Sequence, residues 1–271
     1  MPEQKIIFKN SKGQKLVGIL HTPEGKGPFR ADEGRNRSAD LFPAVVFAHG
    51  FRGRCKDGPK PLALAEALTK KGFVFLRFDF SNIGESEGIF ENTTITQYVD
   101  DLRCAIDFVL KLGFVEKKGV SLIGSSLGGL VATILTTKDK RIKNLVLSSP
   151  VASLDLCTGE LKDLMKKCKE NGYVYVNLIS ANKYCKLNYT FYQDYLKYNG
   201  IEMAKKIDIP TLILHGDKDD LVPLEGSKEI LKNLKGEKAL EVVEGADHYF
   251  REPAQFEKLI KLAVNWIEMH R

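Results

Sequence analysis

A serine between two glycines is the strongest chemical signal in this sequence. The stretch Gly124-Ser125-Ser126-Leu127-Gly128 lies between a short apolar run and a longer apolar-periodic stretch. Strand, tight turn and helix in that order are the context in which a G-x-S-x-G turn presents a serine hydroxyl as a nucleophile. The residues two before and two after the nucleophile crowd each other across the turn and must be small. Gly124 and Gly128 meet this condition around Ser126, whereas bulky residues stand at those positions around Ser125, so Ser126 is the predicted nucleophile.

An acid and a histidine follow two later apolar runs. Asp219 lies in the turn after Thr211–Leu214, and His248 lies in the turn after Leu240–Val243. A serine hydroxyl needs an imidazole to take its proton, and a buried carboxylate holds that imidazole in the required tautomer. The chain order Ser, Asp, His also matches this type of sheet. We therefore predict Ser126, Asp219 and His248 as a catalytic triad.

Neighbouring acids and other histidines compete for these roles. Asp217 is expected to cap the Val222-Pro223 turn, and Asp220 is expected to point to solvent or into its loop. The remaining histidines are assigned structural, packing or surface roles: His21, His49, His215 and His270.

Two backbone N–H groups are predicted to stabilise the negative charge that develops on the carbonyl oxygen. The stretch His49-Gly50-Phe51-Arg52-Gly53 follows the apolar run Ala44–Ala48. In this type of sheet one donor comes from that loop and the other from the residue after the nucleophile. Those residues are Phe51 and Leu127 here, and losing one such donor costs about two to three powers of ten in rate.

Apolar runs alternate with amphipathic stretches along most of the chain. Two alternating runs at the N-terminus predict a β-hairpin, and the later apolar runs predict strands buried on both faces. The expected strands are Lys5–Lys9, Lys15–His21, Pro43–His49, Gly72–Asp79, Gly119–Ile123, Asn144–Ser148, Pro210–His215 and Ala239–Val243. The expected helices are Lys60–Lys71, Ile95–Leu112, Leu127–Thr136, Leu224–Leu234 and Pro253–His270. This order predicts an α/β fold with an eight-stranded, mostly parallel sheet and helices on both faces.

Two segments depart from this alternation. Glu24–Leu41 is a polar, glycine- and charge-rich loop that is longer than an ordinary connection, and we assign it no role. Residues 151–206 fall between the sixth and seventh strands and hold seven of the nine tyrosines. We expect this segment to form a small inserted lid, with residues 1–150 and 207–271 forming the core. Its tyrosines are candidates for binding substrate or for packing the lid: Tyr173, Tyr175, Tyr184, Tyr189, Tyr192, Tyr195 and Tyr198.

Composition points away from several other classes of protein. The net charge of +6 is spread as mixed Lys, Glu and Asp, without the basic, aromatic-interleaved stretches of nucleic-acid binders. Five widely spaced cysteines without a C-x-x-C pair predict neither a disulfide framework nor a metal site, and no cofactor motif occurs. The N-terminus lacks a signal-peptide core, and no apolar run is long enough to span a membrane. We expect a cytoplasmic protein without cofactor or nucleic-acid partner, acting on a small-molecule ester, with a homo-oligomer as an open alternative.

These motifs together resemble the serine-hydrolase branch of the α/β-hydrolase superfamily. The similarity is greatest to the cinnamoyl/feruloyl esterases and to the monoacylglycerol-lipase-like, or serine aminopeptidase S33-like, group. It also rests on Arg77-Phe78-Asp79-Phe80 with Gly84-Glu85-Ser86-Glu87-Gly88, and on Gly245-Ala246-Asp247-His248. The resemblance implies the α/β-hydrolase fold and a serine carboxylesterase for small to medium esters, hydroxycinnamoyl esters among them, with an acyl-enzyme on Ser126. The alternatives are a monoacylglycerol lipase or thioesterase of the same fold, and a non-catalytic binding protein on this scaffold.

Overall fold

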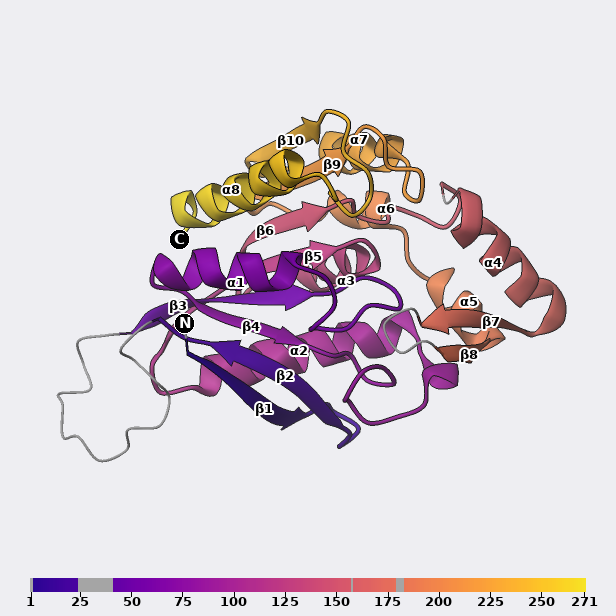
Figure 1. Cartoon of the computed structure of the whole chain (residues 1–271), viewed down its shortest axis with the longest axis horizontal. Coiled ribbons are helices and arrows are strands. Elements are labelled where there is room, and N and C mark those ends of the chain that lie inside the picture. The colour runs from indigo at the N-terminus through magenta and orange to yellow at the C-terminus, as the bar shows by residue number, and fades with distance from the viewer. Residues whose placement is uncertain (1, 24–40, 157, 179–182) are drawn as a thin grey trace.

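An eight-stranded sheet forms the centre of the molecule. The computed structural model describes residues 2–23, 41–156, 158–178 and 183–271. Across the sheet the strands follow the order β1-β2-β4-β3-β5-β6-β9-β10 (Figure 1). Their bounds are β1 Glu3–Lys9, β2 Lys15–His21, β3 Phe42–Ala48, β4 Val74–Phe78, β5 Val115–Ser125, β6 Ile142–Ser148, β9 Thr211–Gly216 and β10 Lys238–Val243. The predicted fold class is confirmed, and all eight expected strands are present.

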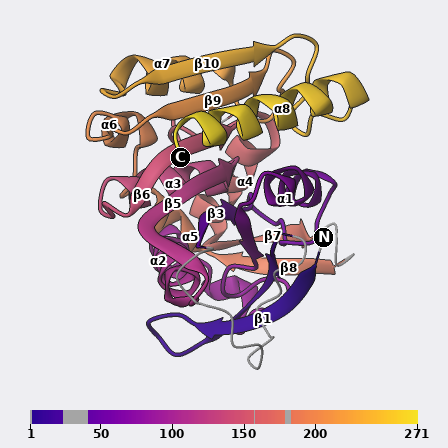
Figure 2. The same ribbon diagram turned by 90° about the vertical axis from the view of Figure 1, so that its left-hand side faces the viewer.

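The sheet is parallel except at its N-terminal edge. β1 pairs antiparallel with β2, and β2 pairs antiparallel with β4. All other neighbouring strands are parallel. Figure 2 shows the sheet from the side, with β1 at one edge and β10 at the other. Every residue of β4 is buried, as expected for a strand covered on both faces.

Helices cover both faces of the sheet and enclose a separate core on each. α1 (Lys60–Lys70) and α8 (Pro253–Met269) lie over one face, and α2 (Ile95–Lys111), α3 (Leu127–Thr136) and α7 (Leu224–Asn233) cover the other (Figure 1). Successive strand residues point to opposite faces. Accordingly, β9 contributes Leu212 and Leu214 to the core under α1 and α8, and Ile213 to the other core.

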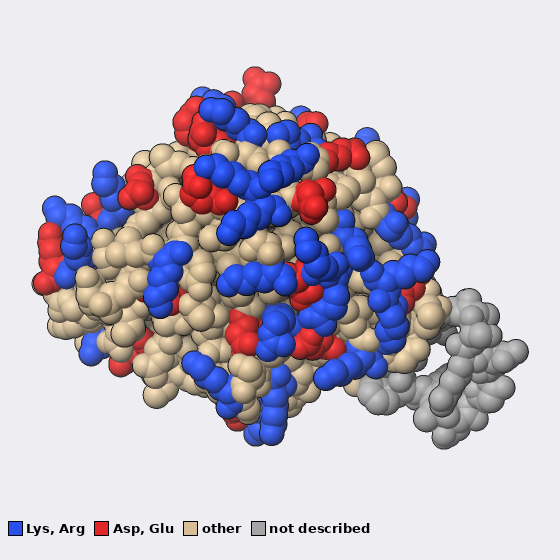
Figure 3. All heavy atoms as spheres, turned by 180° about the vertical axis from the view of Figure 1, so that it is seen from behind, with Lys and Arg blue, Asp and Glu red and all other residues tan. Residues whose placement is uncertain are grey.

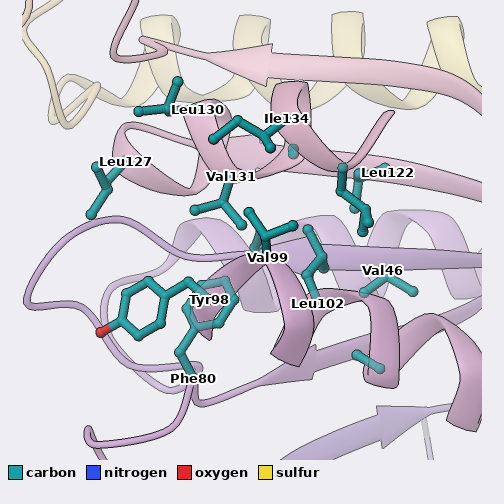
Figure 4. Packing of buried hydrophobic residues seen from close by; sticks show 14 of the residues in the cluster. Val46, Phe80, Tyr98, Val99, Leu102, Leu122, Leu127, Leu130, Val131 and Ile134 are labelled. Carbon is teal, nitrogen blue, oxygen red and sulfur yellow. The ribbon is translucent and has the colours of Figure 1, made fainter. Parts of the chain in front are cut away.

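The larger core anchors the helix that follows the candidate nucleophile. Figure 4 shows side chains of α2 and α3 packed together over the strands: Val99, Leu102, Leu130, Val131 and Ile134 against Val46 and Leu122. The rings of Phe80 and Tyr98 stack beside them with their centroids 4.2 Å apart. This close packing of side chains fixes the position of α3 and therefore the position of the turn that leads into it.

A further group of elements lies between β6 and β9 in the chain. It comprises α4 (Gly159–Asn171), β7 (Tyr173–Leu178), β8 (Lys183–Asn188), α5 (Tyr189–Tyr195) and α6 (Gly200–Ala204). β7 and β8 form an antiparallel hairpin separate from the main sheet. Figure 1 shows α4, α5 and this hairpin beyond the carboxyl ends of the parallel strands, whereas α6 packs against α3 and α7.

Some boundaries differ from those expected from sequence. β5 begins at Val115 and not at Gly119, because Val115 is buried and pairs with Phe42. The polar residues between Val115 and Gly119 hid the first residues of this strand in the sequence pattern. The Glu24–Leu41 loop lies outside the described residues, apart from Leu41.

The charge of the molecule is distributed over its surface. Figure 3 shows the face behind the sheet, where basic side chains are numerous and acidic side chains lie among them. On α2, for example, Arg103 pairs with Asp100 and Asp107 at 2.7 Å.

In the described ranges, no helix has both the length and the apolar character needed to cross a bilayer.

Candidate active site

Ser126 occupies a strained turn at the carboxyl end of β5. Its backbone has φ 55° and ψ −121°, a conformation that a residue with a side chain rarely adopts. The Ser126 N–H donates to the Ser148 carbonyl at 2.9 Å, and α3 begins at the next residue. Strand, turn and helix therefore follow one another as the sequence predicted.

The flanking glycines are required by close backbone contacts. A Cβ on Gly124 would lie 2.6 Å from the Gly128 carbonyl oxygen, so the two positions do crowd each other across the turn. A Cβ on Gly128 would lie only 2.3 Å from the Ala48 carbonyl oxygen. The turn is thus pressed against the end of β3, and glycine is the residue that fits.

The loop after β3 lies beside the Ser126 hydroxyl. A Cβ on Gly50 would lie 3.1 Å from the Ser126 Cβ and 3.6 Å from its Oγ. Phe51, the next residue, and Leu127, the first residue of α3, line the same cavity as Ser126. The first amides of a helix have no partner within it, so the Leu127 N–H is available to an incoming oxygen. Phe51 and Leu127, the two residues predicted to donate their N–H groups, therefore lie in the wall of the cavity that contains Ser126.

Asp219 and His248 come together from the loops after β9 and β10. His248 Nδ1 lies 2.7 Å from Asp219 Oδ2. The other carboxylate oxygen accepts hydrogen bonds from the Leu221 N–H at 3.0 Å and the Val222 N–H at 2.8 Å. The Asp219 side chain is only 1% exposed. An ionised carboxylate can only accept hydrogen bonds, so His248 carries a proton on Nδ1 and directs Nε2 away from Asp219.

The surroundings of Asp219 keep it ionised. Burial by itself would raise the pKa of Asp219, but hydrogen bonds from His215, from His248 and from the loop backbone hold that pKa well below its ordinary value. A carboxylate charged across the physiological range is what a neighbouring imidazole needs to hold its tautomer.

The competing acids contact other groups. Asp217 Oδ1 accepts from the Gly245 N–H at 2.6 Å and so connects the loops after β9 and β10. The prediction that Asp217 caps the turn at residues 222–223 is wrong, because Asp219 itself accepts the hydrogen bonds of that turn. Asp220 is exposed.

Two strand-end histidines have structural hydrogen bonds. His215 is fully buried, with Nε2 2.9 Å from the Val222 carbonyl oxygen and Nδ1 2.7 Å from Ser227 Oγ. Its Nε2 also lies 3.3 Å from Asp219 Oδ2, so it supports the acid of the candidate site. His49 Nδ1 lies 2.9 Å from the Gly50 carbonyl oxygen and so supports the oxyanion loop.

The other two histidines lie elsewhere. His21 is fully buried and accepts a hydrogen bond from Arg77 Nε at 2.8 Å, so it is a packing residue and not a surface one. His270 contacts the Trp266 carbonyl oxygen at the end of α8.

A cavity of about 700 Å³ contains Ser126 and His248 in its wall. The side of the cavity that is formed by the segment between β6 and β9 and by the loop after β9 is apolar. Residues there include Val151, Leu161, Leu164, Phe191, Leu221 and Val222. An apolar cavity beside a nucleophile is suited to an apolar acyl group.

The candidate tyrosines do not act as one group. Tyr195 is buried and lines this cavity, whereas Tyr175 and Tyr184 line a second one. The rings of Tyr189 and Tyr192 stack on each other with centroids 5.5 Å apart. The remaining two make lid or lid-to-core contacts: Tyr173 with Tyr175, and Tyr198 with Thr96.

Lys60 is a cavity residue that sequence reasoning missed. It begins α1, and its ammonium group donates to Ser148 Oγ at 3.1 Å and lies 5.1 Å from the centre of the Phe250 ring. Burial lowers the pKa of Lys60 to about 8, although the Asp219 and Asp247 carboxylates oppose the shift. A lysine in the first turn of a helix is normally solvated, so the sequence contained no signal for this position.

Neither metal nor cofactor chemistry is suggested by the side chains at the site. In the part of the chain that the structure describes, no cluster of three or more His, Cys, Asp or Glu residues could hold a metal ion. A serine hydroxyl and an imidazole that is held by a buried carboxylate share one cavity, and these are the groups that proton transfer to and from a hydroxyl requires.

Comparison with known proteins gives a family and a consistent set of neighbours. The family model described as serine aminopeptidase S33 matches residues 40–187 and 199–253. An uncharacterized 31.7 kDa protein from the traX-finO intergenic region of Escherichia coli is 25% identical over 276 residues, covering 89% of this chain and 94% of that protein. The palmitoyl-protein thioesterase ABHD10, mitochondrial, of Homo sapiens is 25% identical over 223 residues, covering 80% of this chain and 71% of that protein.

Solved structures share the fold over nearly the whole chain. Est1E from Butyrivibrio proteoclasticus with bound ferulic acid superposes with a TM-score of 0.78 at 22% identity, covering 98% of both chains. Mouse α/β hydrolase domain-containing protein 10 gives a TM-score of 0.73 at 19% identity, covering 98% of this chain and 99% of that one. At these identities the likeness concerns the fold.

Proposed function

Since this chain belongs to the serine aminopeptidase S33 family of α/β hydrolases, we propose that it is a serine carboxylesterase with Ser126 as its nucleophile. The observation that carries the proposal is the contact of 2.7 Å between His248 Nδ1 and the buried Asp219 carboxylate, in a cavity shared with the strained Ser126 turn. A relative is named a palmitoyl-protein thioesterase, and the structural neighbour Est1E binds ferulic acid.

The reaction proceeds through an acyl-enzyme in two half-reactions. Ser126 Oγ attacks the ester carbonyl while His248 Nε2 takes the hydroxyl proton, and the N–H groups of Phe51 and Leu127 stabilise the oxyanion. The bond to the leaving group breaks as His248 returns the proton to that group. Water, deprotonated by the same imidazole, then hydrolyses the acyl-enzyme and restores Ser126. Asp219 holds the imidazole orientation throughout.

The cavity favours an ester over a peptide with a free N-terminus. Binding an α-ammonium group requires carboxylates near the reacting carbonyl. Among the residues that the structure describes, the cavity wall instead contains four basic residues, Arg52, Arg54, Lys60 and Arg251, and a single acid, Asp57. Asp57 is itself paired with Arg54 at 3.1 Å. The family's aminopeptidase name therefore does not transfer to this chain as an activity.

The acyl group is expected to lie in the apolar part of the cavity under residues 151–206, which we propose act as a lid. Esters of short and medium chains and of hydroxycinnamic acids are the substrates that this site supports. A thioesterase is the second candidate, because it uses the same acyl-enzyme and because a relative bears that name. A cytoplasmic location belongs to the same proposal.

A substrate panel tests the proposal. It contains p-nitrophenyl esters of rising chain length, methyl ferulate, methyl p-coumarate and an acyl thioester. We expect hydrolysis of at least one class by the wild type, and a loss of about four powers of ten in His248→Ala. His270→Ala, which changes a histidine outside the cavity, is the matched control and keeps full activity. A folded wild type that cleaves none of these compounds would indicate a binding protein on a hydrolase scaffold.

A further inference from the structure

The loop that contains Phe51, a proposed oxyanion donor, is attached to the end of the neighbouring strand. β3 and β4 are parallel, so the loops that follow them leave the sheet at the same edge. The loop after β3 runs from His49 to the start of α1 at Lys60. The motif Arg77-Phe78-Asp79-Phe80 spans the end of β4 beside it. The proposed reaction assigns no role to this motif.

The direction of the Phe51 N–H is set by the carbonyl group of the same peptide unit. The Gly50 carbonyl accepts a hydrogen bond from the Gly53 N–H at 3.1 Å. It also lies 2.9 Å from His49 Nδ1, which carries the imidazole proton because His49 Nε2 accepts from the Phe80 N–H at 3.3 Å. The C=O and N–H of a trans peptide point in opposite directions, so a fixed Gly50 carbonyl fixes the Phe51 N–H. Among the described residues this N–H has no acceptor, which leaves it available to a substrate oxygen.

Cys55 holds the far part of the loop through both of its backbone groups. The Cys55 N–H donates to Asp79 Oδ1 at 2.6 Å, and the Cys55 carbonyl accepts from Arg77 Nη1 at 2.8 Å. All three residues are buried, and hydrogen bonds to charged groups are stronger than those between neutral groups. Gly53, which donates to the Gly50 carbonyl, is only two residues away from Cys55. A displacement at Cys55 would therefore reach the peptide that contains the Phe51 N–H.

The glycine-rich stretch after β4 orients the Asp79 carboxylate. Asp79 Oδ2 accepts from the Glu85 N–H at 2.9 Å, and the Asp79 carbonyl accepts from Ser86 Oγ at 2.6 Å. Gly84 has φ 63°, and a Cβ there would lie 2.1 Å from Asp79 Oδ2, so glycine is the residue that fits. One carboxylate oxygen is thus held by this stretch, and the other is left to hold Cys55.

We propose that Asp79 is a positioning residue of the oxyanion hole, which sets the place of the Phe51 N–H by holding Cys55. The inference rests on the proposed esterase function. In the described part of the chain, Asp79 is not among the residues that line the active-site cavity, so it acts through the loop. Hydrogen bonds weaken steeply as their distance and angle depart from the optimum. A displaced donor should therefore lose much of the two to three powers of ten that one such donor contributes.

Two variants of Asp79 and one matched control test this role. Asp79→Ala removes both acceptors and Asp79→Asn keeps one, so kcat for p-nitrophenyl butyrate should fall about 100-fold and about tenfold respectively. Since the lost interaction is made only in the transition state, kcat/KM should fall by the same factors. Asp101→Asn is the control and should stay within about twofold. Asp101 is an equally buried carboxylate whose hydrogen bonds come from Asn10, Ser81 and Gln97, outside the loop.

Propyl trifluoromethyl ketone distinguishes a positioning role from a purely structural one. Ser126 Oγ adds to its carbonyl carbon while the hydroxyl proton passes to His248, and the carbonyl oxygen becomes an oxyanion. The inhibition constant of this ketone should rise in each Asp79 variant by about the factor by which kcat/KM falls. The apparent pKa of the pH–rate profile should not change, because the contact between His248 and Asp219 joins two other loops.

Arg77→Met provides a second perturbation of the same contact. It removes the donor to the Cys55 carbonyl and keeps an apolar side chain of similar length in the buried position. It should lower kcat and weaken ketone binding together, by about tenfold each. This variant and the nearly isosteric Asp79→Asn decide the question even where Asp79→Ala does not fold.

The inference and the proposed function fail in different ways. Folded Asp79 and Arg77 variants that keep the wild-type kcat overturn the inference alone. A loss of kcat without a matching rise of the ketone inhibition constant, or an equal loss in Asp101→Asn, also overturns it, because the effect would then lie outside the oxyanion hole. A wild type that cleaves no ester contradicts the proposed function itself.

Discussion

Replacing Asp219 by asparagine should inactivate the enzyme while leaving its fold intact. The two carboxylate oxygens have different partners: Oδ1 accepts from the N–H groups of Leu221 and Val222, and Oδ2 faces His248. An asparagine must keep its carbonyl oxygen toward the two backbone donors, because its amide group would meet N–H groups there. The amide therefore takes the Oδ2 position and donates to His248 Nδ1 in place of accepting from it.

That reversal places the remaining imidazole proton on Nε2, which then cannot accept the proton of Ser126. Loss of the correct tautomer costs about 10⁴ in kcat, or about 5.5 kcal/mol of transition-state stabilisation. The two loop hydrogen bonds survive, so the melting temperature should fall by only a few degrees. Asp219→Ala removes them as well and should melt distinctly lower, although its activity should be similar.

The assay is p-nitrophenyl acetate hydrolysis for Asp219→Asn, with Asp217→Asn and Asp220→Asn as matched controls on the same loop. Both controls should retain most of the wild-type kcat, because neither side chain contacts His248 in the structure. Retention of more than a tenth of the activity in Asp219→Asn, or a larger loss in Asp217→Asn, would refute the assignment of the acid.

Three further predictions concern the turn, the buried histidine and the cavity lysine. Gly128→Ala should lower the melting temperature by about 5 °C or more, because the added Cβ would overpack against β3. Gly113→Ala is the control and should not lower it, because a Cβ there meets nothing within 4 Å. Equal melting temperatures of the two variants would contradict this prediction. Burial and the Arg77 charge lower the pKa of His21 from 6.5 to about 4, so the folded state binds this proton less tightly than the unfolded state. The unfolding free energy should therefore fall by about 3 kcal/mol as the pH drops from 6.5 to 4. In His21→Gln, denaturation curves measured at several pH values should show a smaller fall of the unfolding free energy between pH 6.5 and pH 4. An equal fall in the variant and the wild type would refute the lowered pKa of His21. Because burial lowers the pKa of Lys60 to about 8, the rate at which acetic anhydride acetylates it should rise with pH and level off above pH 8; a rate, followed by peptide mass spectrometry, that still rises steeply between pH 9 and pH 10 would argue against a lowered pKa.

Much of the fold was predictable because buried parallel strands leave a simple signal. Runs such as Ala44–Ala48 are apolar without alternation, and a helix such as α2 has one apolar face. The Ser126 turn was predictable for a steric reason, since few residues other than glycine fit at positions 124 and 128. Asp219 and His248 followed from the rule that strand ends meet at one edge of a parallel sheet.

The segment between β6 and β9 was not predictable in the same way. β7 and β8 form a two-stranded hairpin whose residues are mostly half-buried or exposed, so their pattern is close to that of a polar loop. Lys60 and the role of Asp217 were missed for another reason. Each depends on a contact between segments far apart in the chain, with Ser148 and with Gly245 respectively, and no local pattern encodes such a contact.

The central claim, that Ser126 carries the acyl group, is tested most directly by labelling the protein with a fluorophosphonate and mapping the adduct by peptide mass spectrometry. The account predicts one adduct on Ser126 in the wild type, an unchanged adduct in Ser125→Ala, and none in a folded Ser126→Ala. An adduct on Ser125, or labelling that persists in Ser126→Ala, would contradict it.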